Sequence, residues 1–360
     1  MSTAADVRAK LSAARRVILK IGSKSLSGDA WQRMAVEVQA ARDAGRDVII
    51  VSSGAIALGI QRLGLAGRPK DMPRLQAAAA AGQSALMRRW EVAFEPLGMV
   101  AAQVLLTHAD LADRQRTNNA QRAIEALVEA RAIPIINEND AVSVEEIKFG
   151  DNDQLASMVV PLVGADLLLL LSDVDGLLDA SGRRVPFVRS VSDEARSLAS
   201  GSKSGVGTGG MTSKLEAARR ATLAGAHVVI AAAREPNVVT RVLAGDDLGT
   251  VFPAVQQRLS ARKHWIAFTL RPRGALLLDA GASQAVAKNK SVLAVGVVGV
   301  RGTFNAGDSV SLFDPSGREV ARGLTRMSVG DAARACGRRN EDGQSEELVH
   351  RDDLVVLPSD

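Results

Sequence analysis

Several residue types that mark particular protein classes are scarce in this sequence. Cys336 is the one cysteine among 360 residues, so an internal disulfide is excluded and a reducing compartment is expected. The four histidines, His108, His227, His264 and His350, lack the spacing of metal ligands, and we expect no zinc site. No run of about 18 apolar residues occurs, which argues against a membrane-spanning helix.

Charge is distributed unevenly along the chain. The formal net charge is +5, yet residues 274–360 hold ten Lys and Arg against twelve Asp and Glu. The positive excess therefore lies in the first part of the chain. A basic balance can indicate nucleic acid, but an anionic small substrate explains it at least as well. The first residues include Asp6 and no apolar segment, so we expect no signal peptide and a cytoplasmic location.

Alternating apolar and amphipathic stretches predict an α/β fold over the larger part of the chain. Strands are expected at 17–21, 48–51, 99–106, 132–136, 165–171, 227–231 and 249–252. Helices are expected between them, including 30–44, 74–94, 118–130 and 215–224. This alternation specifies a mostly parallel open sheet sandwiched by helices.

The last part of the chain has a different pattern. Its β-branched and apolar segments alternate with Gly and Asp turns, which predicts a small β-rich, barrel-like domain. The stretch 258–273 before it is basic and contains Pro272 near its end. A chain of 360 residues fits more than one domain. We expect a domain at 1–262, a linker at 263–273 and a second domain at 274–360.

Two polar clusters bracket a loop in the middle of the chain. Residues 137–140 (Asn-Glu-Asn-Asp) follow a predicted strand, and residues 151–153 (Asp-Asn-Asp) precede a helical pattern. Carboxylates suit an ammonium and amides suit either end of a zwitterion. Any one of these residues is explained as well by a turn or a helix cap. The group together predicts a clamp for a small zwitterion.

Two lysines each lie at the end of a segment that resembles a phosphate-binding site. Lys20 ends a buried strand, where an unpaired ammonium is costly, so it needs an anion. Lys214 ends a glycine-rich stretch, 205–214, that opens a helix, where a bound phosphate would offset the unfavourable helix dipole. A flexible surface loop with an incidental lysine is the alternative. The turn Ser52-Ser53-Gly54 is a weaker signal of the same kind.

Three familiar motifs do not fit. Gly-Ser-Lys-Ser after Lys20 lacks the upstream glycine of a P-loop. The glycines before Lys214 do not follow a strand directly, unlike a dinucleotide fingerprint. Asp173-Val-Asp175-Gly is similar to a phosphatase nucleophile motif, but Leu177 stands where that motif has Thr or Val, and the position is mid-chain. Calcium loops are excluded because the later Gly and Glu are missing.

Taken together, the motifs have a strong family likeness that covers nearly the whole chain. They are ILKIGS at Lys20, VSSGAIALG at Ser53, LLTHADLADR from Leu105, IPIINENDAVSVEEIKFGDND from Ile133, LLLLSDVDGL from Leu168, GTGGMTSK ending at Lys214, RKHWI from Arg262, LDAGA at Asp279 and HRDDLVVL from His350. In this order they resemble the glutamate 5-kinase family, in which an amino-acid-kinase domain is followed by a PUA domain.

The resemblance implies transfer of the ATP γ-phosphoryl group to the side-chain carboxylate of L-glutamate, the first step of proline biosynthesis. It implies that Lys20 and Lys214 stabilise the moving group and that Asp153 holds both lysines. It assigns glutamate binding to Ser53, Asn137, Asp140 and Asn152. It assigns ATP binding to Lys20, Ser172, Asp173, Thr208, Gly209, Gly210, Met211, Thr212, Ser213 and Lys214. Mg²⁺ is expected on the nucleotide phosphates, with no protein metal site.

The resemblance also carries expectations about regulation and partners. The family is commonly inhibited by proline and commonly oligomeric, so both are expected here. Lys24 stands where relatives have a small residue, Ser172 replaces a frequent Thr, and the absence of tyrosine means that any aromatic contact to adenine must differ. We expect the two lysines to lie in an open site, so that replacing either barely changes stability.

Two other functions remain as alternatives. One is a different amino-acid or carbamate kinase of the same fold, against which the INEND…GDND spacing argues. The other is RNA binding by the C-terminal domain, since PUA domains often bind RNA. The acidic balance of residues 274–360 and their few aromatics, Phe304 and Phe313, argue against it.

Overall fold

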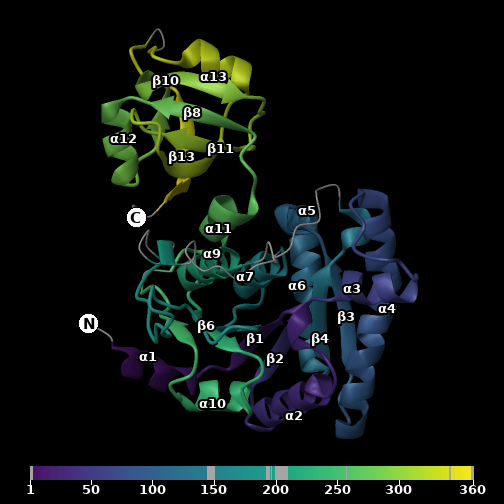
Figure 1. Cartoon of the computed structure of the whole chain (residues 1–360). Coiled ribbons are helices and arrows are strands. Elements are labelled where there is room, and N and C mark those ends of the chain that lie inside the picture. Colours follow the sequence, from purple (N-terminus) through teal and green to yellow (C-terminus); the bar gives the residue numbers. More distant parts are fainter. Residues whose placement is uncertain are drawn as a thin grey trace. The chain divides into compact units, whose positions relative to one another are not determined.

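Residues 3–143, 151–191, 195, 197–198, 210–256, 258–339 and 342–357 are described by a computed structural model of the chain. The chain divides into two compact units, Met1–Arg258 and Leu259–Asp360 (Figure 1). Searching the described part of the chain for a helix long and apolar enough to cross a membrane finds none.

A twisted sheet forms the centre of the first unit. Within the described residues it has seven strands in the order β3-β4-β2-β1-β5-β6-β7. Neighbouring strands are parallel except for β6 and β7. The strands are β1 (Arg16–Ile21), β2 (Asp47–Ser52), β3 (Ala101–Leu106), β4 (Ile133–Glu138), β5 (Leu167–Ser172), β6 (His227–Ala232) and β7 (Thr250–Phe252). The predicted mostly parallel open sheet is confirmed.

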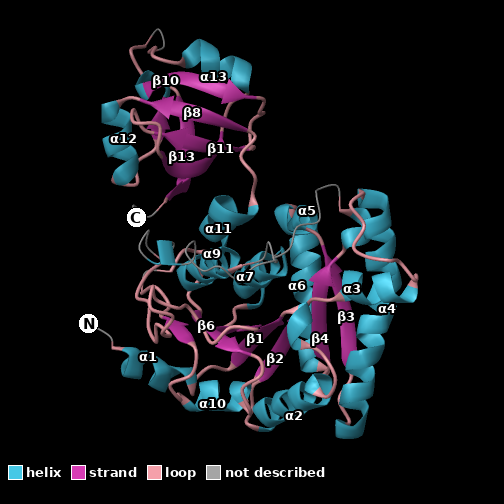
Figure 2. Cartoon of the chain, viewed as in Figure 1, coloured by secondary structure: helices cyan, strands magenta, loops and turns pink. Residues whose placement is uncertain are grey.

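Helices cover both faces of this sheet (Figure 2). They are α1 (Ala4–Leu11), α2 (Ala30–Asp43), α3 (Ala55–Arg62), α4 (Met72–Phe94), α5 (His108–Ala112), α6 (Arg114–Glu129), α7 (Asp151–Val163), α9 (Met211–Leu223) and α10 (Val238–Ala244). One hydrophobic core joins the sheet to α1, α2, α3, α4 and α10, and another joins it to α6, α7 and α9. The fold is therefore a three-layer sandwich.

Strand β1 shows how the two cores fix the direction of a functional side chain. Val17, Leu19 and Ile21 belong to the first core, and Ile18 belongs to the second. Since successive side chains of a strand point to opposite faces, Lys20 shares the face of Ile18. That face carries α7 and α9. The position of the lysine follows from the two-residue period of the strand.

The second unit is built on its own sheet. Among described residues its order is β10-β8-β11-β12-β13-β9, with a separate hydrophobic core. The strands are β8 (Gly274–Leu278), β9 (Val292–Leu293), β10 (Val297–Gly302), β11 (Ser309–Phe313), β12 (Glu319–Thr325) and β13 (Glu347–Val356). Two helices, α12 (Ala280–Ala287) and α13 (Val329–Ala335), were not expected from the sequence.

The predicted linker lies inside this second unit. It contains α11 (Ala261–His264) and a turn of π-helix, Trp265–Thr269. The Arg322 side chain donates to the Ala267 carbonyl at 2.7 Å, and Arg262 pairs with Asp353. This segment is thus tied to β12 and β13. The domain bounds 1–262, 263–273 and 274–360 themselves stay predictions.

Candidate functional site

Three charged side chains meet at the carboxyl end of β1. Lys20 Nζ lies 2.6 Å from Asp153 Oδ1, and Lys214 Nζ lies 3.3 Å from Asp153 Oδ2. Asp153 therefore gives one carboxylate oxygen to each ammonium group. The structure brings together the three residues for which a catalytic role was predicted. Two cations on one anion leave this cluster with a net positive charge.

All three side chains of this charged cluster are buried. Lys20 is 6%, Lys214 7% and Asp153 0% exposed. The expectation that the lysines lie in an open site is wrong, because β1, α7 and α9 enclose them. Burial lowers the pKa of Lys20; the charge of Asp153 opposes this shift and that of Lys214 adds to it.

Helix starts position two members of the cluster. Asp153 lies in the first turn of α7 (Asp151–Val163), where the helix dipole favours a carboxylate. Lys214 lies in the first turn of α9 (Met211–Leu223), where the dipole disfavours a cation. Helices α7 and α9 pack against each other, and the ion pair to Asp153 offsets that unfavourable term. A phosphate at this place would offset it further.

A neutral hydrogen-bond network lies beside the charged cluster. The Asn152 amide donates to Ser53 Oγ and to Asn137 Oδ1, both at 2.9 Å. Asn137 Oδ1 also accepts the backbone N–H of Glu138 at 2.9 Å. The ends of β2 and β4 and the start of α7 are thereby joined. Ser53 and Asn137, both predicted to bind substrate, are therefore joined through Asn152, a third such residue.

Asp140 is the fourth residue predicted to bind the amino acid. It opens a short 3₁₀ turn, Asp140–Val142, and is 8% exposed. Burial lowers the pKa of Arg68, and the charge of Asp140 acts against that shift. Asp140 is therefore within electrostatic reach of a guanidinium from the loop between α3 and α4. Sequence reasoning gave no indication of this arginine.

Apart from Lys20 on β1, the described residues predicted to bind nucleotide lie at the carboxyl end of β5 and at the start of α9. Ser172 Oγ donates to Asp173 Oδ1 at 3.1 Å, and Lys24 Nζ lies 3.8 Å from Asp173 Oδ2. Burial acts to raise the pKa of Asp173, but the Ser172 hydrogen bond and the charges of Lys24 and Lys214 outweigh it, so the pKa is lowered. Lys24, which stands where relatives usually have a small residue, thus forms an exposed ion pair with a residue predicted to bind the nucleotide.

The glycine-rich loop is only partly described. Gly210 precedes α9 as its N-cap, and Met211, Thr212, Ser213 and Lys214 are the first four residues of the helix. Thr208 and Gly209 lie outside the described residues. A search of the described residues for three or more His, Cys, Asp or Glu placed to hold a metal ion gives none.

Comparison with known proteins decides the family. The sequence matches the amino acid kinase family over residues 15–232 and the PUA domain over residues 274–343. A glutamate 5-kinase from Myxococcus xanthus is 45% identical over 377 residues, covering 99% of this chain and 100% of that protein. One from Syntrophotalea carbinolica is 43% identical over 366 residues, covering 96% and 98%. This chain belongs to the glutamate 5-kinase family.

Solved structures with the same fold lie further away in sequence. N-acetylglutamate synthase from Neisseria gonorrhoeae, complexed with coenzyme A and N-acetyl-glutamate, has a TM-score of 0.54 at 17% identity, covering 69% of this chain and 62% of that one. Carbamate kinase from Giardia lamblia bound to AMP-PNP has a TM-score of 0.50 at 17% identity, covering 68% and 100%. These likenesses show the amino acid kinase fold.

Sequence reasoning missed polar contacts that α4 of this glutamate 5-kinase family member makes with the site. Gln76 Nε2 donates to the Ser143 carbonyl at 3.0 Å, and Gln83 Nε2 to the Glu138 carbonyl at 3.4 Å. Trp90 Nε1 donates to Ser52 Oγ at 3.1 Å. The only signal in the sequence is their spacing of seven residues, which places all three on one helix face.

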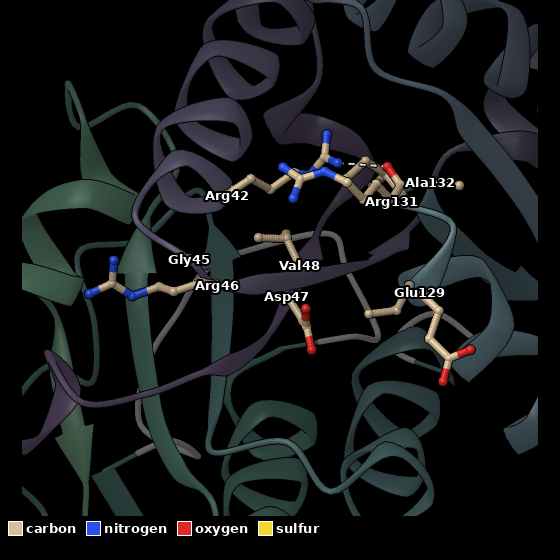
Figure 3. A pocket seen from close by; sticks show the side chains of 10 residues that line it. Arg42, Gly45, Arg46, Asp47, Val48, Glu129, Arg131 and Ala132 are labelled. Carbon is tan, nitrogen blue, oxygen red and sulfur yellow. Dashed lines mark hydrogen bonds between the residues drawn. The ribbon is translucent and has the colours of Figure 1, made fainter.

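A separate cavity of about 340 Å³ lies at the amino ends of β2 and β4 (Figure 3). It is lined by Arg42, Gly45, Arg46, Asp47, Val48, Val128, Glu129, Arg131, Ala132 and Ile133. Arg42 lies beside Arg131 and donates to its carbonyl at 2.6 Å. Ser53 and Asn137 of this glutamate 5-kinase family member, both predicted site residues, sit at the opposite, carboxyl ends of these two strands. Ligands of open α/β sheets collect at those ends.

Proposed function

We propose that the chain transfers the γ-phosphoryl group of ATP to the side-chain carboxylate of L-glutamate, giving L-glutamyl 5-phosphate and ADP. One observation carries the assignment. Asn152 and Asp153 are neighbours at the start of α7, and Asn152 bonds the neutral network while Asp153 holds both lysines. The residues that bind the amino acid and the pair of lysines are therefore connected through two adjacent residues of one helix.

The reaction needs no general base to activate the nucleophile. A side-chain carboxylate is ionised at neutral pH, so it is already the nucleophile. One of its oxygens forms a bond to the γ-phosphorus while the bond to the β,γ-bridging oxygen breaks, and the electron pair leaves with ADP. Catalysis then consists of positioning and of relieving charge repulsion. Lys20 and Lys214 supply positive charge where negative oxygens gather, in a buried environment that strengthens the effect.

Asp153 acts as a positioning residue in this account. Its two oxygens hold the ammonium groups against each other's repulsion. Ser53, Asn137, Asp140 and Asn152 bind glutamate, with Asp140 as the carboxylate for its ammonium group. Ser172, Asp173 and residues 208–214 bind the nucleotide. These roles follow from the family likeness and, where the structure describes the residue, from the contacts around it.

Mg²⁺ is proposed to arrive with ATP on its phosphate oxygens, where it would neutralise charge on the transferred group. The residues fit this arrangement. Asp173 offers an exposed carboxylate at the end of β5, within electrostatic reach of Lys214. Mg²⁺ in proteins is commonly held by one or two carboxylates together with substrate phosphates.

A coupled assay of ADP release tests the function. The purified full chain is given Mg²⁺, ATP and, separately, L-glutamate, L-aspartate, N-acetyl-L-glutamate or carbamate. We expect turnover with L-glutamate well above the other acceptors. Turnover with carbamate or N-acetylglutamate alone would assign the chain to another kinase of the same fold. No turnover with glutamate would overturn the proposal.

Regulation and partners stay predictions. Inhibition by proline and a homo-oligomeric state are expected from the resemblance, and a cytoplasmic location is expected from the sequence of the first residues. RNA binding by the second unit is not favoured, because residues 274–360 carry more acidic than basic side chains. Filter binding of the full chain to structured RNA at low salt would test it, and tight, salt-sensitive binding would revive it.

A further inference from the structure

One face of α4 contacts the segments that carry Ser53, Asn137 and Asp140, three of the four residues predicted to bind glutamate. Gln76 holds the carbonyl of Ser143, just after the turn that contains Asp140. Gln83 holds the carbonyl of Glu138, next to Asn137. Trp90 holds Ser52, next to Ser53, and both partners are fully buried. Three donors at seven-residue spacing on α4 therefore hold the ends of β2 and β4 and the loop after β4 against one helix.

Backbone contact ties α3 to the same helix. A Cβ on Gly59 would lie 1.7 Å from the Ala78 carbonyl oxygen, and one on Gly82 would lie 1.7 Å from the Ala55 carbonyl oxygen. Only glycine permits such an approach. Helix α3 starts at Ala55, directly after Ser53 and Gly54. The turn that carries Ser53 is therefore held from both sides by α4.

Gln83 is a poor choice for stability alone. Its Nε2 donates to Glu138, but its Oε1 is buried and has no donor among the described residues. A buried oxygen without a donor is unfavourable, and an apolar side chain of the same shape would avoid it. A role in the site accounts for an amide at this position.

We propose that α4 fixes the shape of the amino-acid pocket and that Gln76 and Gln83 are positioning residues for the residues that bind glutamate. Their amides set the separation between the segment 137–143 and the turn at Ser53, and hence the space that the acceptor occupies. The inference rests on the proposed function. It assigns to these glutamines an effect on glutamate binding that ATP binding does not share.

Gln→Met substitutions in the full chain test this assignment, because methionine keeps the length and removes the amide. We expect Gln83→Met and Gln76→Met each to raise the KM for glutamate about five- to tenfold, as for one lost hydrogen bond. The KM for ATP should stay within about twofold. The midpoint of thermal unfolding should fall only slightly, because each variant loses one hydrogen bond, and least for Gln83→Met, which also removes a buried oxygen without a donor. Gln61→Met, on the exposed side of α3, is the matched control and should change nothing.

The outcomes separate this inference from the function itself. An unchanged glutamate KM in both variants, with normal wild-type turnover, overturns the inference alone. Equal rises in both KM values, or a lower unfolding midpoint with an unchanged KM, also overturn it, because these indicate a structural role. Wild-type protein without glutamate turnover overturns the proposed function and this inference together. The two variants break separate bonds, so loss of folding in one leaves the other to decide.

Discussion

The two halves of the site are built from different interactions. The phosphoryl half consists of Lys20, Asp153 and Lys214, three charges buried within ion-pair distance. The amino-acid half consists chiefly of neutral amides and a hydroxyl, with Asn152 at its centre. The first half depends on the balance of charge, because each buried ion is costly without its partner. The second half depends on geometry, since each hydrogen bond contributes modestly.

This difference predicts which changes damage the fold and which damage one substrate only. Removing the shared anion leaves two buried cations facing each other. Removing one cation leaves a neutral pair. Removing an amide or carboxylate from the amino-acid half leaves the charge cluster intact. The predictions below follow that order, from the largest expected effect to the smallest.

Asp153→Asn should be the most damaging change. It leaves Lys20 and Lys214 buried without a counter-charge, and loss of one partner from a buried ion pair costs about 3–5 kcal/mol. We expect urea unfolding at neutral pH to show this loss, together with the loss of turnover. Asp166→Asn is a control for charge removal elsewhere and should keep turnover, because this carboxylate accepts two backbone N–H bonds at the amino ends of β1 and β5.

The same variant should change the pH dependence of stability. Burial already lowers the pKa of Lys20, and Asp153 is the main group that opposes this. Without Asp153 the pKa falls further, so the folded state loses its proton while the unfolded lysine, with a pKa of about 10.4, keeps it. The unfolded state then binds more protons, and stability must rise with pH up to that value. A slope no steeper than that of the wild type between pH 6 and 9 would contradict the assignment.

Lys20→Ala and Lys214→Ala should separate activity from stability. Each removes one positive charge from the transferred group, and loss of one such stabilising group lowers kcat by about 10²- to 10³-fold. Asp153 keeps one ammonium partner in either variant, so the unfolding free energy should change far less than in Asp153→Asn. Steady-state kinetics and urea unfolding on the same preparations check both. Parallel losses of folded protein and activity would count against the catalytic role.

Asp140→Ala should affect one substrate only. A hydrogen bond to a charged group is worth about 1.5–3 kcal/mol, so the KM for glutamate should rise about tenfold to a hundredfold. The KM for ATP should stay nearly unchanged, because Asp140 belongs to the turn after β4 and not to the nucleotide segments. A larger rise in the ATP value would show that the two subsites are exchanged.

Lys24→Ala should have the smallest effect. Lys24 and Asp173 form a long, 3.8 Å ion pair with exposed fractions of 67% and 58%. Pairs of this kind contribute about 0–1 kcal/mol. We expect stability to be unchanged and the KM for ATP to shift by no more than about threefold. A tenfold rise would instead make Lys24 part of nucleotide binding.

Local patterns predicted most of the first unit and the two lysines of its charged cluster. Lys20 at the end of an apolar strand needs an anion, and its strand period fixes the face on which it points. The position of Lys20 shows that it needs an anion but does not identify the anion. The strand pattern suggested a phosphate. In the structure the anion beside Lys20 is Asp153, from a helix more than a hundred residues away in sequence. The likeness to a family, and not the residue pattern, supplied that pairing.

Other features could not be predicted, because they depend on tertiary contacts or on short signals. Gln83 contacts Glu138, 55 residues away, and nothing local marks it. Helices α12 and α13 are eight and seven residues long, too short for a clear apolar period. Their N-caps, Asp279 and Ser328, were the available signals. The basic sequence around Trp265 predicts a linker, whereas the structure has a four-residue helix and a π-helical turn there.

The most direct test is a crystal structure of the full chain with L-glutamate, Mg²⁺ and a non-hydrolysable ATP analogue. The account predicts that the γ-phosphate lies between Lys20 Nζ and Lys214 Nζ, with the glutamate side chain directed at it from the network of Ser53, Asn137 and Asn152. A nucleotide phosphate bound elsewhere, with the two ammonium groups still facing only Asp153, would contradict it.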